Sequence, residues 1–180
     1  MASGAPADVD RVELIGGVEH RELVLAPHDP GWADRFENER RRIVAALGAR
    51  ALQLEHIGST AVPGLPAKPI IDVLVTVERI ADEVAYLPAL VAAGYALRVR
   101  EPGHRLFRTP ARDVHVHVLQ HGDPAAAAYL DLRDRLRVSE VARERYTATK
   151  RALIATGITD MNVYSDGKGD VIAAIRAGEY

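Results

Sequence analysis

Residues 69–77 read Pro-Ile-Ile-Asp-Val-Leu-Val-Thr-Val, and this stretch decides the fold. A nearly continuous run of branched apolar residues predicts a central β-strand that is covered on both faces. One carboxylate, Asp72, interrupts the run. Burying a carboxylate alone is costly, so Asp72 needs a metal ion, another cation or a ligand hydroxyl beside it. The stretch therefore predicts a covered sheet with a functional residue inside it.

A second predicted strand, residues 52–57, ends in a Gly-Ser-Thr turn just before this run. The glycine lets a ligand approach the main chain, and a helix that starts after the serine would direct its first amides at a phosphate. The alternative interpretation is a simple turn, with Asp72 capping nearby amides. In the functional interpretation, the candidates for holding phosphate here are Gly58, Ser59, Thr60 and Lys68.

Residues 113–118 alternate strictly between polar residues and valines. In a strand this period places Asp113, His115 and His117 on one face. Two histidines at this spacing can both bind a metal, or one can act as a base while the other contacts phosphate. The alternative is a solvent-facing polar side of an antiparallel strand. If this strand lies beside the Asp72 strand, both histidines enter the same cleft, and His56 is a further candidate metal ligand.

The other four histidines lie near turns or termini and are predicted to be on the surface: His20, His28, His104 and His121.

Turn residues and hydrophobic periodicity predict the remaining elements. Short strands are expected at 22–25, 95–100, 104–109 and 114–119, the last three as an antiparallel meander. Helices are expected at 30–47, 80–93 (bent or split at Pro88), 124–136 (started by Asp123-Pro124), 139–155 (capped by Ser139) and 169–177. The expected fold is α/β (α+β), a mixed sheet flanked by helices with helical additions at the C-terminus.

A length of 180 residues favours one domain. We expect it to span residues 20–180, after a flexible arm over residues 1–19 that has few apolar residues to order it. No apolar run approaches the roughly 20 residues of a membrane span, and the N-terminus does not resemble a signal peptide, so a cytoplasmic protein is expected. The absence of cysteine excludes disulfides and thiolate metal sites.

Charge narrows the class of partner. The net charge is −2, the pI is about 6.4 and 5% of residues are aromatic, which argues against a nucleic-acid surface. Basic residues on the C-terminal helices are instead candidates for a small phosphorylated ligand, although helix-borne cations are often simply solvated. These candidates are Arg133, Arg137, Lys150 and Lys168. Tyr146 and Tyr164 each precede one of these lysines by four residues, which hints at a shared cleft.

The run Glu-His-Ile-Gly-Ser-Thr-Ala-Val-Pro-Gly-Leu at 55–65, followed by Ala-Lys-Pro-Ile-Ile-Asp at 67–72, closely resembles the signature of the GrpB family. The blocks at 27–32, 115–118 and 132–137, with the two tyrosine–lysine pairs, extend the resemblance over about residues 22–178. That family belongs to the nucleotidyltransferase superfamily. The resemblance implies a minimal mixed sheet, a Gly-Ser loop for a triphosphate and carboxylates that hold divalent metal.

In that superfamily the metal-binding strand usually carries two carboxylates at alternate positions, with a third on a later strand. Asp72 matches the first position, Leu74 falls on the second, and His115 or His117 falls near the third. The usual two-metal centre is therefore not expected in standard form. A divalent metal (Mg²⁺, Mn²⁺ or Zn²⁺) between Asp72 and the two histidines is expected instead, and imidazole favours Mn²⁺, Zn²⁺ or Fe²⁺ over Mg²⁺.

The leading hypothesis is a metal-assisted transferase of the nucleotidyltransferase type, acting on a nucleotide or another phosphorylated small molecule. Asp72, His115 and His117 would be its catalytic residues. One alternative is a non-catalytic module that binds nucleotides or anions. The other is a metal-dependent enzyme of another class, a hydrolase or a small-molecule ligase, that uses the same cleft.

Overall fold

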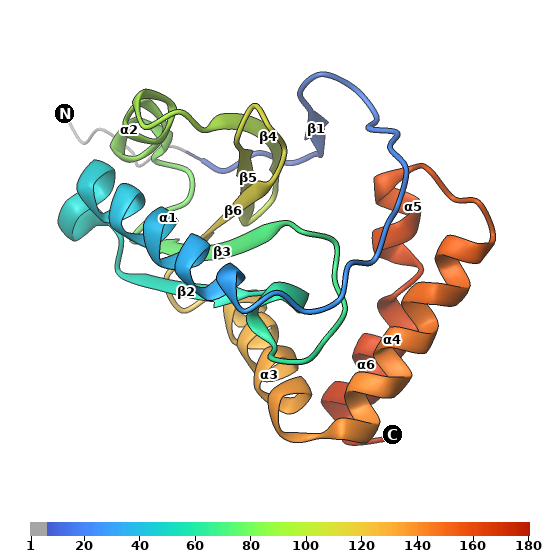
Figure 1. Cartoon of the computed structure of the whole chain (residues 1–180). Coiled ribbons are helices and arrows are strands. Elements are labelled where there is room, and N and C mark those ends of the chain that lie inside the picture. The colour runs from blue at the N-terminus through green and yellow to red at the C-terminus, as the bar shows by residue number, and fades with distance from the viewer. Residues whose placement is uncertain (1–6) are drawn as a thin grey trace, which may run out of the picture.

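The strand predicted around Asp72 lies inside a six-stranded mixed sheet of order β1-β4-β5-β6-β3-β2 (Figure 1). The computed structural model describes residues 7–180. β3 pairs antiparallel with β2 and parallel with β6, and β4, β5 and β6 form the predicted antiparallel meander. The strand bounds are β1 Glu13–Leu14, β2 Gln53–Ile57, β3 Ile71–Val77, β4 Ala96–Glu101, β5 His104–Arg108 and β6 Val114–Gln120.

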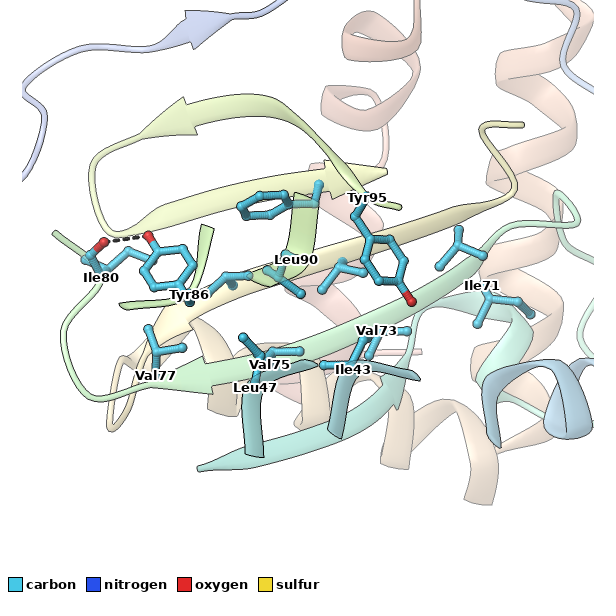
Figure 2. Close-up of a cluster of buried hydrophobic side chains, with 14 of the residues drawn as sticks. Ile43, Leu47, Ile71, Val73, Val75, Val77, Ile80, Tyr86, Leu90 and Tyr95 are labelled. Atoms are coloured by element: carbon cyan, nitrogen blue, oxygen red, sulfur yellow. Dashed lines mark hydrogen bonds between the residues drawn. The ribbon is translucent and has the colours of Figure 1, made fainter. Parts of the chain in front are cut away.

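One face of the sheet packs against α1 (Gly31–Leu47) and α2 (Leu87–Ala92) and forms the main core. Figure 2 shows valines of β3 directed at Ile43 and Leu47 of α1. Trp32 is 1% exposed, and Tyr86 closes one end by donating a hydrogen bond of 2.6 Å to the Ile80 carbonyl. These contacts bury the alternate apolar residues of β3 and β6, which is the largest favourable contribution to folding.

The opposite face is covered in part by α3 (Pro124–Val138), with Ala126 packed on Ile57, Leu74 and Leu119. Three further helices stand beside the sheet, away from α1 and α2, and Figure 1 draws them in orange and red. They are α4 (Glu140–Ala155), α5 (Met161–Asp166) and α6 (Gly169–Ala177). A second apolar cluster, which includes Val62, joins α3, α4 and α6 to the loop after β2. A cavity remains between this face and the helices.

Local sequence explains where the C-terminal helices begin. The Asp123 side chain accepts a hydrogen bond of 2.8 Å from the Ala125 amide at the start of α3. Ser139 does the same at 3.1 Å for α4. Both are N-caps that satisfy amides without helical partners, as predicted. Asp160 caps α5, a short helix that was not predicted.

Two predicted elements were wrong. Residues 22–25 form no strand: Leu23 is buried, but the nearest ladder contact that follows them is an isolated bridge between Ala26 and Ala67. The helix predicted over residues 80–93 is a 3₁₀ turn at Glu83–Ala85 followed by α2. Pro88 lies in the first turn of α2, where its missing amide costs nothing, and this divides the predicted helix in two.

The N-terminal segment was predicted to be a flexible arm over residues 1–19, of which residues 1–6 lie outside the described part. Its mobility stays a prediction, but its described residues lie on the domain. β1 pairs with β4, and the Asp8 carboxylate accepts hydrogen bonds from the Arg105 side chain and the Gly103 amide. Polar contacts thus place this segment, whereas the prediction considered apolar contacts only. Within residues 7–180, the helices are too short or too polar to cross a bilayer.

Candidate functional site

The residue pairing of β3 with β6 brings the predicted catalytic residues together. Asp72 lies opposite His115, and Leu74 lies opposite His117. In a sheet, residues in register point to the same face, and here that face is the one turned away from α1 and α2. This confirms that the histidine strand lies beside the Asp72 strand.

The Asp72 carboxylate and the two imidazoles form a compact group of possible metal ligands. Asp72 Oδ1 lies 3.4 Å from His115 Nδ1 and 3.4 Å from His117 Nε2. One potential ligand atom from each of the three residues lies within 4.8 Å of the others. Burial opposes ionisation of Asp72, but hydrogen bonds and charge from the two histidines outweigh it and hold the carboxyl pKa well below its usual value. Burial also lowers the pKa of His117.

These donors fit one divalent cation rather than two. One carboxylate with two imidazoles is a donor set suited to Mn²⁺, Zn²⁺ or Fe²⁺. A second cation would need another carboxylate at Leu74, which is fully buried in the cluster of Ile57, Leu119 and Ala126. The donor set therefore agrees with the single-cation centre predicted from the sequence.

Gly58 lets the main chain touch the Asp72 carboxylate. Its φ is 70°, and a Cβ built at this position would lie 2.5 Å from Asp72 Oδ2. The following turn is a single 3₁₀ turn, Ser59–Ala61, rather than the α-helix that the phosphate-loop interpretation allowed. Thr60 is buried and donates a hydrogen bond of 3.0 Å to the Ile70 carbonyl, so its hydroxyl braces the loop. Ser59 faces the cavity and lies 3.3 Å (Oγ) from Lys150 Nζ.

Three lysines enter this cavity from three separate segments. The Lys68 and Lys168 ammonium groups lie 4.5 Å and 4.8 Å from the centre of the Tyr164 ring. Lys150 Nζ lies 4.9 Å from the Tyr146 ring centre and donates to Ser59 and to the Pro66 carbonyl. These cation–π contacts confirm that each predicted tyrosine–lysine pair shares a helix face or turn.

No carboxylate within the described residues forms an ion pair with any of the three ammonium groups. Burial, followed by repulsion from Lys168, lowers the pKa of Lys68 to about 8. Burial and the neighbouring lysines lower that of Lys150 to about 7. Buried cations are rarely left unpaired, so this wall of the cavity is suited to an anionic ligand.

The composition of the chain holds a signal for this convergence that the motif-based prediction missed. The chain has only three lysines among its 23 basic residues, and all three lie in this cavity. Most arginines lie outside it, and the three that line it, Arg98, Arg108 and Arg133, are held by carbonyl or carboxylate oxygens. The rarity of lysine therefore singles out this set from the sequence alone.

Arg133 and Arg137 also lie near the cavity, but their guanidinium groups already have partners. Arg133 Nη1 donates to Glu55 Oε2 at 2.9 Å and to the His56 carbonyl at 3.0 Å. Arg137 Nε donates to the Ala61 carbonyl at 3.0 Å. Both side chains therefore fix the end of β2 and the loop that follows it.

His56 does not lie with Asp72, His115 and His117, the group of possible metal ligands. It lies opposite Val73 in the pairing of β2 with β3, so it points to the core face. Its ring stacks on Phe36 with centroids 4.5 Å apart, and its Nε2 lies 3.0 Å from Thr60 Oγ1. Burial lowers its pKa to about 4. The structure thus gives His56 a bracing role in the core, and the geometry offers no support for it as a metal ligand.

His104 was predicted to be on the surface, and this was wrong. Its Nε2 lies 3.1 Å from His117 Nδ1, and its Nδ1 lies 2.5 Å from Glu101 Oε1. The two rings are 12° from parallel with centroids 5.2 Å apart, which is the geometry of an in-plane hydrogen bond. A hydrogen-bonded chain therefore runs from Glu101 through both imidazoles to Asp72. Such outer partners set the tautomer of a metal-binding histidine.

Asp72 with its two histidines, Ser59, the three lysines and the two tyrosines line one cavity of about 370 Å³. The Asp72 group lies on its floor, formed by the sheet, and the lysines and tyrosines lie on its helical wall. A cavity of this size fits a small molecule. The site therefore places a carboxylate–histidine group opposite a wall of lysines and tyrosines.

The chain belongs to the GrpB family, because residues 22–177 match the sequence profile described as GrpB protein. It is 55% identical over 170 residues to the UPF0157 protein SCO7215 of Streptomyces coelicolor, covering 94% of this chain and 91% of that one. It is similar to the crystal structure of the conserved protein GrpB from Enterococcus faecalis, with a TM-score of 0.75, 30% identity, and 87% and 96% of the two chains covered.

A dephospho-CoA kinase of Mycolicibacterium paratuberculosis is 31% identical over 169 residues, but these cover only 42% of that protein and 78% of this chain.

Proposed function

We propose that this protein is a metal-assisted transferase of the nucleotidyltransferase type, acting on a nucleotide or another phosphorylated small molecule. One observation carries the proposal. Three lysine ammonium groups, that of buried Lys150 and those of half-buried Lys68 and Lys168, face a carboxylate–histidine group across a single cavity and have no carboxylate partner within the described residues. A ligand that carries several phosphate charges would satisfy both sides at once, because its oxygens can bind a cation and accept hydrogen bonds from lysine.

The roles follow from position. Lys68, Lys150 and Lys168 would neutralise the phosphate chain, and the cavity-facing hydroxyl of Ser59 would donate to it. Gly58 has no side chain, which would leave room for a phosphate oxygen to approach Asp72.

Asp72, His115 and His117 would hold one divalent cation, Mn²⁺, Zn²⁺, Fe²⁺ or Mg²⁺. The bound cation would supply Lewis-acid stabilisation of charge that develops on a phosphate oxygen.

The proposed reaction joins an acceptor to the α-phosphate of a nucleoside triphosphate. The acceptor oxygen forms a bond to the α-phosphorus, the bond from that phosphorus to the bridging oxygen breaks, and pyrophosphate leaves. The acceptor proton passes to water. Lysines on the helical wall would stabilise the charge on the departing pyrophosphate, and the pair of histidines would keep Asp72 ionised.

The similarity to a protein named dephospho-CoA kinase also supports a phosphorylated ligand, although the matched part is under half of that protein. The buried Leu74 favours a centre with one cation and separates this proposal from a two-metal mechanism.

The test is transfer of label from nucleotides that carry ³²P at the α-phosphate, with each divalent cation in turn, to candidate small acceptors. We expect pyrophosphate release that depends on Asp72, with activity lost in Asp72→Ala and retained in the exposed control Asp170→Ala. Nucleotide binding without turnover would favour the non-catalytic module. Stoichiometric Zn²⁺ or Fe²⁺ that is lost in His115→Ala, together with hydrolysis of the label, would favour a metal-dependent hydrolase.

A further inference from the structure

Four residues form a row across the cavity floor. Ile57 of β2 pairs with Asp72 of β3, Asp72 pairs with His115 of β6, and His115 pairs with Arg108 of β5. Residues in register share a face, so all four point towards the helices. Adjacent strands are about 4.8 Å apart, which places Arg108 about 10 Å from Asp72 along the row.

Different cationic side chains therefore lie on the two sides of Asp72. On the β2 side, Gly58 and Ser59 continue from Ile57, and Lys150 reaches this turn. On the β5 side, the cavity is lined by Arg108. The proposed cation site lies between an anion-binding wall on one flank and a guanidinium on the other.

Arg108 already holds a carboxylate. Its Nη1 forms a close ion pair with Glu19, whose other oxygen lies 3.4 Å from Arg112 Nη1. The Arg108 and Glu19 side chains are 19% and 13% exposed, so the pair is largely enclosed by the cavity. Because a guanidinium binds carboxylate and phosphate with the same fork geometry, Glu19 occupies a position that an acidic ligand could take.

The segment that carries Glu19, residues 15–21, is held mainly by polar contacts at its two ends. Arg98 donates to the Ile15 and Gly17 carbonyls at one end. At the other end, the Arg21 amide donates to Thr159 at 3.0 Å and the Met161 amide donates to the Glu19 carbonyl at 3.1 Å.

Its apolar side chains add little, since Ile15 and Val18 are 37% and 50% exposed. A segment with so little buried apolar surface can be displaced locally at small cost.

We propose that Arg108 anchors a second anion subsite, which binds a carboxylate or phosphate group of the acceptor molecule. Glu19 fills this subsite when the acceptor is absent. The two ligands would then bind on opposite flanks of Asp72, the phosphate chain at the lysines and the acidic acceptor at Arg108. The acceptor role of this subsite rests on the proposed transferase function, whereas anion binding by Arg108 does not.

Calorimetry on the full chain tests the subsite, with inorganic phosphate and succinate as separate probes. Glu19→Gln removes the internal competitor while it keeps the size of the side chain. We expect it to bind at least one of the two probes about tenfold or more tightly than the unaltered protein. The probe that gains identifies phosphate or carboxylate as the preferred group. The exposed Glu22→Gln is the matched control and should gain nothing.

Adding Arg108→Gln to Glu19→Gln should abolish the gain. Unchanged affinity in Glu19→Gln, or a gain that survives the loss of Arg108, would overturn the proposal. Hydrogen exchange of the Met161 amide gives a test without substitutions, because displacement of Glu19 should speed it at saturating probe concentration and an unchanged rate contradicts the subsite. Adding Lys150→Gln separates the two proposals, since it should weaken the lysine wall and leave the gain at Arg108 intact.

Discussion

The two faces of β3 and β6 are built from alternate residues of the same strands, yet one face forms the apolar core and the other lines the cavity. On the core face, Val73, Val75 and Val116 are fully buried against α1 and α2. On the cavity face, Asp72 and His115 occupy neighbouring positions. Because side chains alternate in a strand, moving a residue by one position along the strand moves its side chain from the core face to the cavity face.

The faces also differ in how their polar groups are satisfied. On the core side, His56 has Thr60 and Phe36, and Tyr95 donates to Glu39. On the cavity side, Lys150 has a ring face, a hydroxyl and a carbonyl oxygen and Lys168 has a ring face, but neither has a counter-ion within the described residues. The core side thus pairs these polar groups, whereas the cavity side keeps charged lysines without counter-ions, which favours the cavity as the place for an anionic ligand.

Moving a carboxylate by one residue should give the largest effect. Val73→Asp buries a charge among α1 and β3 side chains and should cost about 4 kcal/mol or more, which is enough to unfold many domains. Asp72→Val should cost clearly less, because the valine buries no charge and the two histidines that lose their partner can hydrogen-bond to water in the cavity. Urea unfolding of both variants measures this, and equal losses of stability would contradict the comparison.

Acid should destabilise the core face through His56. Its folded pKa of about 4 lies below the usual value of 6.5, so the unfolded chain takes up the proton first as pH falls. Stability should be flat above pH 6.5 and fall by about 3 kcal/mol between pH 6.5 and 4. Denaturation at each pH measures the slope, which should be shallower in His56→Gln. The same slope in both proteins would show that His56 does not carry it.

Sulfate binding should test the unpaired lysines, since sulfate does not titrate in the relevant range. Lys150→Gln should weaken sulfate by about tenfold or more, and the exposed Arg151→Gln should not. In the unaltered protein, affinity should fall as pH rises through about 7 and 8, where Lys150 and Lys68 lose their protons. Calorimetry in two buffers should detect proton uptake on binding between about pH 7 and 9. A pH-independent affinity would contradict protonated lysines as the binding groups.

The smallest effect is expected from the hydrogen-bonded chain behind His117. His104→Phe removes the partner of His117 Nδ1 and should weaken Mn²⁺ or Co²⁺ by about tenfold. The Co²⁺ absorption spectrum should shift as well, because it reports the geometry of the ligands. His121→Gln, at an exposed histidine, is the control. An unchanged spectrum and affinity in His104→Phe would reduce His104 to a packing residue.

Local patterns predicted the parts of this molecule that local physics decides. The valine–histidine alternation at 114–118, the apolar run at 71–77 and the caps Asp123 and Ser139 all lie where the sequence placed them. Each depends on residues within a few positions of one another, which makes it readable from sequence.

Long-range arrangement accounts for what was missed. Asp72 and His117 are 45 residues apart. From the sequence, their shared cleft could be predicted only on the condition that their two strands are neighbours. His104 became part of the site through the pairing of β5 with β6, although the turn before it is typical of a surface position. The strand predicted at 22–25 had suitable residues but no neighbouring strand to pair with over its length.

Manganese titration with and without a nucleoside triphosphate tests the central claim most directly, that one cavity holds a cation and a phosphate chain together. Electron paramagnetic resonance counts free Mn²⁺ in each sample. We expect one Mn²⁺ per chain, bound about tenfold more tightly when the nucleotide is present, and lost in Asp72→Asn. No Mn²⁺ binding, or binding that is the same in Asp72→Asn and indifferent to nucleotide, would contradict it.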